Sequence, residues 1–295
     1  MEIIKRLLKD RPVLFDGSTG TELQRMGLPN GVTPEAWNLD HPEKVEQMAK
    51  DYVDAGAKVI ETNTFGGNKI RLKAAGLADS FEEINIVGIS IAHRVARSKA
   101  AVIASIGPLG TLIEPYGEVT QDEAKQCFRE QARVIKKVGI EAVVIETMIS
   151  LEEAVLAFEG VKEAGIEEIG VTMSYEVGQQ GIRTAYGESI KDVVRKMEEM
   201  GVSFIGSNCG NGFENMLLVA RELRESSSLP ILVQPNAGVP VFNGKEIVHP
   251  GTPEQFGEFV ASAISIGVDF VGGCCGTTPA HIREGKKILD RLKAN

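Results

Sequence analysis

The sequence lacks the features that mark several classes of protein. No apolar run approaches the roughly 18 residues that a membrane-spanning helix needs. The amino-terminal segment MEIIKRLLKDRP is interrupted by charges, unlike the apolar stretch of a signal peptide. The net charge is −9 and no basic run is present, which argues against nucleic acid or an anionic membrane surface as a partner. We therefore expect a cytoplasmic protein.

Cysteine is also scarce. The 295 residues include four cysteines, at positions 127, 209, 274 and 275. In a reducing compartment, so few cysteines indicate metal binding or catalysis more than disulfide bonds. A chain of this length buries enough apolar surface to fold without a disulfide or a metal. Cys127 lies in the amphipathic segment QDEAKQCFREQARVIKKV, where we interpret it as a small buried apolar residue.

Short runs rich in β-branched residues recur along the chain. Each is almost continuously apolar until its last residues, which is typical of parallel strands buried on both faces. Eight such runs predict strands at residues 12–17, 58–63, 101–107, 141–147, 168–174, 202–208, 231–236 and 269–275.

Helix-like segments alternate with these strands. They cover residues 42–56, 81–99, 120–139, 150–165, 189–201, 214–226, 253–267 and 279–294. Strict alternation of eight strands and eight helices predicts a parallel sheet, and the count and total length match a closed barrel. An open doubly wound sheet is the competing fold, but no G-x-G-x-x-G follows the first strand. We expect residues 1–295 to form one domain, a single (β/α)8 TIM barrel.

The carboxyl ends of the predicted strands carry polar and metal-binding residues. In such barrels the chemistry takes place at this end. Three of the four cysteines fall there, which is the strongest single signal in the sequence. The full set of strand ends is Asp16-Gly17, Thr62-Asn63, Gly107-Pro108, Glu146-Thr147, Ser174, Asn208-Cys209, Pro235-Asn236 and Cys274-Cys275.

The three strand-end cysteines predict a metal site. Cys209 and Cys274 are 65 residues apart, on the sixth and eighth strands, which flank the seventh in a closed barrel. Thiolates suit zinc, and three protein ligands leave one position for a substrate. The glycines around Cys274 and Cys275 would let both side chains turn toward one ion. The alternatives are ordinary core cysteines or a vicinal disulfide.

Asparagine and histidine are two further residue types that could bind a metal near this site. Asn236 follows the seventh strand and could offer its side-chain oxygen to the metal or to a metal-bound water; a turn-capping role is equally compatible with the sequence. The four histidines do not fall at strand ends. His281, the nearest to the cysteine pair in the chain, is interpreted as a surface or helix-capping residue.

The motifs along the chain resemble those of a known family. The chain resembles the homocysteine S-methyltransferases over essentially its whole length, and the T-N-T-F-G and P-N-A-G forms are most similar to the zinc-containing homocysteine-binding module of cobalamin-dependent methionine synthase. Here the module would stand alone, because 295 residues leave no room for folate, corrinoid and reactivation domains. The motifs are D-G-S-T-G-T-E (16–22), E-T-N-T-F-G (61–66), I-G-P (106–108), I-E-T (145–147), N-C-G (208–210), P-N-A-G (235–238) and G-G-C-C-G-T-T-P (272–279).

The resemblance implies roles for the matching residues. The zinc ligands would be Cys209, Cys274 and Cys275. Asp16 and Glu146 would hold the amino group of homocysteine, and Gly17 with the backbone of Ser18 and Thr19 would receive its carboxylate. Without the cysteines, both acids would more simply be helix caps or buried, paired acids. Asn63 would help to shape the site or pack the barrel mouth.

The resemblance also implies a reaction, the conversion of homocysteine to methionine. The methyl donor would be a methylated corrinoid carried by a partner corrinoid protein, with methylcobalamin as a free surrogate. The alternatives are S-methylmethionine as donor, another thiol as acceptor, or a zinc- and homocysteine-binding subunit that is inactive without its partner. The chain departs from the family pattern at Ser18-Thr19, around Ser174-Tyr175, and at Gln234, where an acidic or aromatic residue is common.

Overall fold

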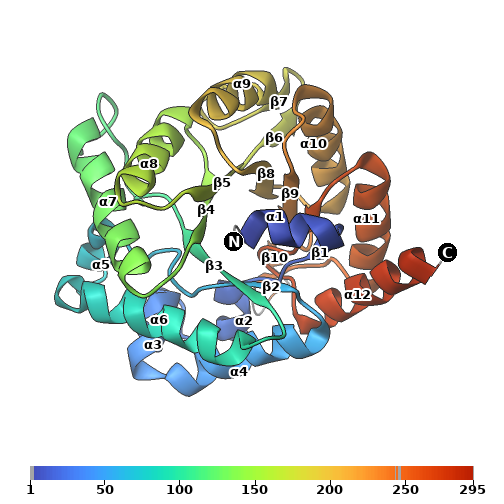
Figure 1. The fold of residues 1–295 in the computed structure, drawn as a ribbon, viewed down its shortest axis with the longest axis horizontal. Helices are drawn as coiled ribbons and strands as arrows, with labels where there is room; N and C mark the ends of the chain where they lie inside the picture. Colours follow the sequence, from blue (N-terminus) through green and yellow to red (C-terminus); the bar gives the residue numbers. More distant parts are fainter. Residues whose placement is uncertain (1–2, 243, 245–246, 295) are drawn as a thin grey trace.

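The computed structural model describes residues 3–242, 244 and 247–294. Eight parallel strands form its main sheet in the order β1-β12-β9-β8-β5-β4-β3-β2, and a bridge between Phe15 and Val59 brings the two edges of the sheet together. The nearly closed ring confirms the predicted (β/α)8 barrel (Figure 1). The strands are β1 (Val13–Leu14), β2 (Val59–Glu61), β3 (Ala101–Ile106), β4 (Ala142–Met148), β5 (Glu168–Met173), β8 (Phe204–Cys209), β9 (Ile231–Pro235) and β12 (Phe270–Val271).

The eight long helices of the described residues surround the ring, as Figure 1 shows. Each ends within three residues of its predicted bounds, because capping residues mark the helix termini in the sequence. Thr120 and Thr252, for example, form capping boxes with the third residue of their helices. The helices are α4 (Pro42–Ala55), α6 (Phe81–Ala96), α7 (Gln121–Lys137), α8 (Leu151–Glu163), α9 (Ile190–Met200), α10 (Phe213–Ser226), α11 (Pro253–Ile266) and α12 (Pro279–Ala294). None of the described helices is long and apolar enough to cross a membrane.

The structure also contains short elements that the sequence did not predict. They are too short to show a periodic pattern of apolar residues. Helical pieces are α1 (Ile3–Leu7), η1 (Leu8–Asp10), α2 (Thr19–Arg25), η2 (Pro34–Ala36), α3 (Trp37–Asp40), α5 (Lys69–Ala74) and η3 (Ala78–Ser80); two hairpins pair β6 (Glu176–Gly178) with β7 (Gly181–Arg183) and β10 (Val241–Phe242) with β11 (Ile247–Val248).

The first of these elements, α1, closes one end of the barrel. It lies across the centre of the ring in Figure 1. Ile4 and Leu7 are buried in the same cluster as inward-facing side chains such as Phe204. The backbone N–H groups of Ile3 and Ile4 donate to the carboxylate of Glu168, at the start of β5, the second at 2.9 Å. The amino end of the barrel is therefore filled, and the residues that follow the strands lie at the opposite end.

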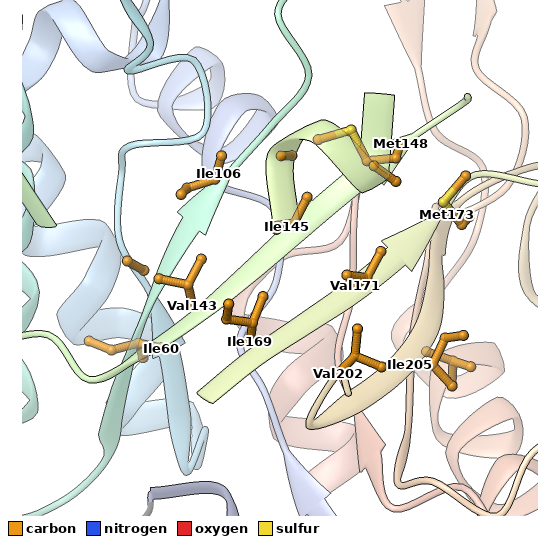
Figure 2. Packing of buried hydrophobic residues seen from close by; sticks show 14 of the residues in the cluster. Ile60, Ile106, Val143, Ile145, Met148, Ile169, Val171, Met173, Val202 and Ile205 are labelled. Atoms are coloured by element: carbon orange, nitrogen blue, oxygen red, sulfur yellow. The ribbon is translucent and has the colours of Figure 1, made fainter. Parts of the chain in front are cut away.

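The strands are apolar on both faces, as the sequence predicted. In β4, Val143 and Ile145 belong to the outer core between the strands and the helices, whereas Ala142 and Val144 belong to the inner core. Figure 2 shows the outer set, in which Val143 and Ile145 lie alongside side chains of neighbouring strands such as Val171. Successive side chains enter different cores, but both cores are apolar. The strands therefore appear in the sequence as continuous apolar runs rather than as alternating apolar and polar residues.

Inward packing leaves no space at Gly170 of β5, where an added Cβ would overlap the ring of Phe204. We expect Gly170→Ala to lower the free energy of unfolding by roughly 1–3 kcal/mol, the usual cost of overpacking a core. Urea titration measures this change. Gly178 is the matched control because an added Cβ there has no neighbour within 4 Å. Equal destabilisation by both substitutions would contradict the packing described here.

Candidate metal centre

Three cysteines meet at the mouth of the barrel. Cys209 ends β8, and Cys274 and Cys275 follow β12. Their sulfur atoms all lie within 4.8 Å of one another, and the sulfurs of Cys209 and Cys274 are 3.1 Å apart. Sulfurs bound tetrahedrally to one zinc ion are roughly 3.8 Å apart, from a bond length of about 2.3 Å. The arrangement fits a metal, and 3.1 Å is too long for a disulfide bond.

The backbone around the cysteines is held by β9, the strand between them. The N–H groups of Asn236, Ala237 and Cys274 bond to the carbonyls of Cys209, Cys275 and Pro235 respectively, at 2.9 to 3.1 Å. Cys209 itself has a φ of 64°, a left-handed conformation that is costly for a residue other than glycine. The seventh strand of the barrel thus connects the two cysteine segments, as predicted.

The sulfur cluster shares negative charge unevenly. Hydrogen bonds from the thiols of Cys209 and Cys274 lower the pKa of Cys275 to about 3. The hydrogen bonds with Cys209 and Cys275 raise the pKa of Cys274 well above its usual value. Ionising a second thiol places like charges side by side, which is costly without a counter-charge. A divalent cation is the partner that would allow all three to ionise.

The cysteines line a cavity of about 310 Å³. Its wall includes the carboxyl groups of Glu35, Glu61 and Glu146, and Arg71 is the one described cation on it. A larger hollow of about 610 Å³ lies at the amino ends of β1–β3, with lysines and arginines but no thiol in its wall. Of these two cavities, the smaller one is the candidate substrate site because its wall combines thiols with buried acids.

Glu146 lies where the sequence predicted, at the barrel mouth. It is buried, and its two carboxylate oxygens accept hydrogen bonds from Ser105 Oγ and from Asn208 Nδ2, the latter at 3.2 Å. Burial raises its pKa to about 7. A bulge between Ile145 and Met148 interrupts the pairing of β4 with β5 at this point. Bulges of this kind often re-aim a side chain beside a site.

Asn208 connects this carboxyl group to the sulfur cluster. It is fully buried, and its Nδ2 donates to Thr147 Oγ1 at 2.6 Å and lies 3.6 Å from Cys209 Sγ and 3.9 Å from Cys274 Sγ. Its Oδ1 accepts from the N–H of Thr147 at 2.8 Å, which holds that residue at a φ of 62°. Asn208 was not predicted as a site residue, although the N-C-G motif contains it.

Asp16 and Glu61 lie together on the first two strands. Asp16 is buried; its Oδ2 accepts the N–H of Glu61 at 2.9 Å and its Oδ1 has no hydrogen-bond partner among the described residues. Glu61 Oε1 accepts from Gln234 Nε2 at 3.1 Å. Burial, and then the nearby charge of Glu146, raise the pKa of both acids well above their usual values. Asp16 was predicted; Glu61 was missed, although E-T-N-T-F-G begins with it.

The predicted carboxylate-binding segment also reaches the cavity, whose wall includes Gly17, Ser18 and Thr19. The N–H of Ser18 is already bonded to Thr277 Oγ1 at 3.1 Å, and its side chain caps α2. The N–H groups of Gly17 and Thr19 form no hydrogen bond with a described residue. Only glycine fits at position 17, because an added Cβ would lie 2.8 Å from the ring of Tyr52.

Asn236 lies next to the cluster but does not line the cavity. Its Nδ2 donates to the carbonyl of Gly210 at 2.8 Å, and its Oδ1 is buried without a partner among the described residues. Asn63 packs the barrel mouth, donating to Pro34 O and Asn38 Oδ1. A role of Asn236 or Asn63 in binding a metal or substrate stays a prediction.

Two expectations about residues outside the metal site can be compared with the structure. Cys127 is buried in α7, as predicted. His281 is buried rather than on the surface, so that alternative is wrong. Its Nδ1 accepts the N–H of Thr278 at 3.2 Å, just before α12, and its Nε2 lies 3.0 Å from Gly251 O. It acts as the predicted cap.

Known proteins share sequence with this chain. The family model for homocysteine S-methyltransferase matches residues 13–289. The methionine synthase of Mycobacterium tuberculosis is 33% identical over 303 residues, which covers 97% of this chain and 25% of that protein. The methionine synthase of Mycobacterium leprae is 33% identical over 293 residues, which covers 94% of this chain and 24% of that protein. The chain thus spans about a quarter of the length of these relatives.

Solved structures share the fold. The metallated form of the homocysteine methyltransferase MmuM from Escherichia coli superposes with a TM-score of 0.80 at 19% identity, covering 96% of this chain and 99% of that one. The carboxyl transferase domain of Rhizobium etli pyruvate carboxylase superposes with a TM-score of 0.56 at 13% identity, covering 98% of this chain and 49% of that one. At these identities the likeness shows the barrel alone.

The family model covers almost the whole chain, and the motifs that it matches include both cysteine segments. This chain belongs to the homocysteine S-methyltransferase family.

Proposed function

We propose that the chain is a zinc-dependent methyltransferase that moves a methyl group to the thiol of homocysteine and so forms methionine. The observation that carries this proposal is the meeting of three thiols, within 4.8 Å of one another, on the wall of a cavity that also presents Glu146. Membership of the family supports the acceptor and the reaction type. The metallated form of the similar E. coli enzyme supports a metal.

The ligand set suits zinc. Cys209, Cys274 and Cys275 would hold the ion and leave one position for the substrate, the pattern of a catalytic rather than a structural site. Bound there, Zn²⁺ would keep the substrate thiol in its nucleophilic thiolate form at neutral pH. Three thiols that must stay reduced for this purpose fit a cytoplasmic location.

Residues in and next to the cavity wall would position the amino acid end of homocysteine. Glu146, which is on the wall and is fixed by Ser105 and Asn208, would accept hydrogen bonds from the ammonium group. Asp16 would join it: this acid is not itself on the wall, but it precedes the wall residue Gly17, and its buried Oδ1 has no hydrogen-bond partner among the described residues. A bound ammonium would favour the ionised form of both acids. The free N–H groups of Gly17 and Thr19 would bind the carboxylate. Fixed in this way, the thiol end is directed at the cysteines, and orientation itself contributes to the rate. Asn236 would offer its oxygen to the metal or to a metal-bound water when substrate is absent.

A methylated corrinoid is the donor that we propose, delivered by a corrinoid protein and replaceable by free methylcobalamin. The relatives named methionine synthase, and the T-N-T-F-G and P-N-A-G motifs, support this choice. S-methylmethionine is the second candidate donor. We further propose that residues 1–295 act as one homocysteine-binding unit.

Cys274→Ser tests the ligand assignment. We expect zinc content to fall from about one ion per chain to nearly none, and methyl transfer to be lost, because two thiolates do not hold catalytic zinc tightly. Metal analysis by mass spectrometry and circular dichroism measure zinc and folding. Cys127→Ser, a substitution of a buried cysteine outside the cluster, should keep its zinc. Unchanged zinc in Cys274→Ser would show that the ligands are assigned wrongly.

Parallel assays with homocysteine and two methyl donors test the reaction. We expect methionine from methylcobalamin at a rate at least about tenfold above that from S-methylmethionine, a difference in activation free energy of roughly 1.4 kcal/mol. Chromatographic detection of methionine measures both rates. Methionine from S-methylmethionine alone would overturn the corrinoid proposal. If neither donor gives methionine although zinc and homocysteine bind, the chain is a binding subunit.

A further inference from the structure

Glu61 is an acid on the cavity wall to which the assignments above give no role. It ends β2 and lines the same cavity as Glu146 and the three cysteines. Its Oε1 accepts one hydrogen bond, from Gln234, and its Oε2 accepts none from a described residue. The side chain is only partly buried, so this second oxygen is available to a ligand in the cavity.

The surroundings of Glu61 lack a compensating positive charge. Asp16, Glu61 and Glu146 influence one another's ionisation, and none of them forms an ion pair within the described parts of the chain. Buried acids of like charge are costly unless a cation joins them. Arg71 also lines the cavity, but its guanidinium stacks 5.3 Å from the ring of Phe65 and its Nη1 lies 3.4 Å from Pro108 O. A positive group that stabilises the ionised form of these acids would therefore have to come from the ligand.

Gln234 explains how Glu61 is kept in place. It belongs to β9, which is not a neighbour of β2 in the sheet, so its hydrogen bond to Glu61 crosses the barrel mouth. An acid at position 234 would instead repel Glu61. The neutral amide can donate a hydrogen bond to the carboxylate at position 61, whereas an ionised acid has no hydrogen to donate.

We propose that Glu61, oriented by Gln234, binds the amino group of the thiol substrate as a third carboxylate beside Asp16 and Glu146. The site would then be specific for thiols that carry an ammonium group and would select against mercapto acids that lack one. This inference rests on the proposed function, because it concerns the same substrate cavity.

Binding of two thiols to the zinc-loaded protein tests the inference. The probes are homocysteine and 4-mercaptobutyrate, which has the same thiol and carboxylate but no amino group. Titration calorimetry gives the ratio of their dissociation constants. We expect Glu61→Gln to reduce the preference for homocysteine roughly tenfold or more, the usual effect of losing a hydrogen bond to a charged group. Gln234→Leu should shift the ratio in the same direction.

Glu35→Gln is the matched control. Glu35 lines the same cavity, but both of its oxygens are occupied, one by the N–H of Gly66 at 2.6 Å and the other by Thr33 Oγ1. Its substitution should leave the ratio of the two dissociation constants unchanged. Thermal unfolding of each variant shows that the barrel is intact.

Two results would overturn the inference, and only the second would also overturn the proposed function. If Glu61→Gln weakens both thiols by the same factor, Glu61 only shapes the cavity, and the proposed function stands. If the wild-type protein binds neither thiol, the proposed function fails and the inference fails with it.

Discussion

The site depends on the convergence of parallel strand ends at one mouth of the barrel. Cys209 and Cys274 are separated by 65 residues, yet β8, β9 and β12 are consecutive strands of the sheet, and the two sulfurs lie 3.1 Å apart. The fold brings them together, so the cysteines themselves need not contribute to its stability. Ionising all three crowded thiols places like charges side by side, and a divalent cation bound between them would offset that cost.

Local strain is concentrated around this cluster. Thr147 and Cys209 are two of the three described residues other than glycine with positive φ, and both contact Asn208. Each such conformation costs about 1–3 kcal/mol and persists where surrounding contacts over-determine it. Asn208 supplies those contacts through both ends of its amide. The same side chain bonds to Glu146 and lies beside two sulfurs, so one buried amide fixes the carboxylate and the candidate metal ligands relative to each other.

The barrel could be predicted from the sequence because long periodic segments with capping residues mark their own ends. The short elements could not: α1 has five residues, too few for a pattern, and its position under the barrel depends on Glu168, far away in the chain. In the site, motifs identified Cys209 and Glu146, since their residue types suggest chemistry on their own. Glu61 and Asn208 were missed because their importance comes from partners on other strands.

The cavity brings ionisable sulfur atoms and carboxyl groups together around one space of about 310 Å³. In the proposed function, a zwitterionic thiol would interact with both, because its sulfur would complete the metal site and its ammonium group would stabilise the ionised acids. X-ray absorption at the zinc edge, before and after addition of homocysteine, tests this claim most directly. We expect the zinc to have three sulfur neighbours at about 2.3 Å in the free protein and four in the complex. Fewer than three at the start, or no change on addition, would contradict it.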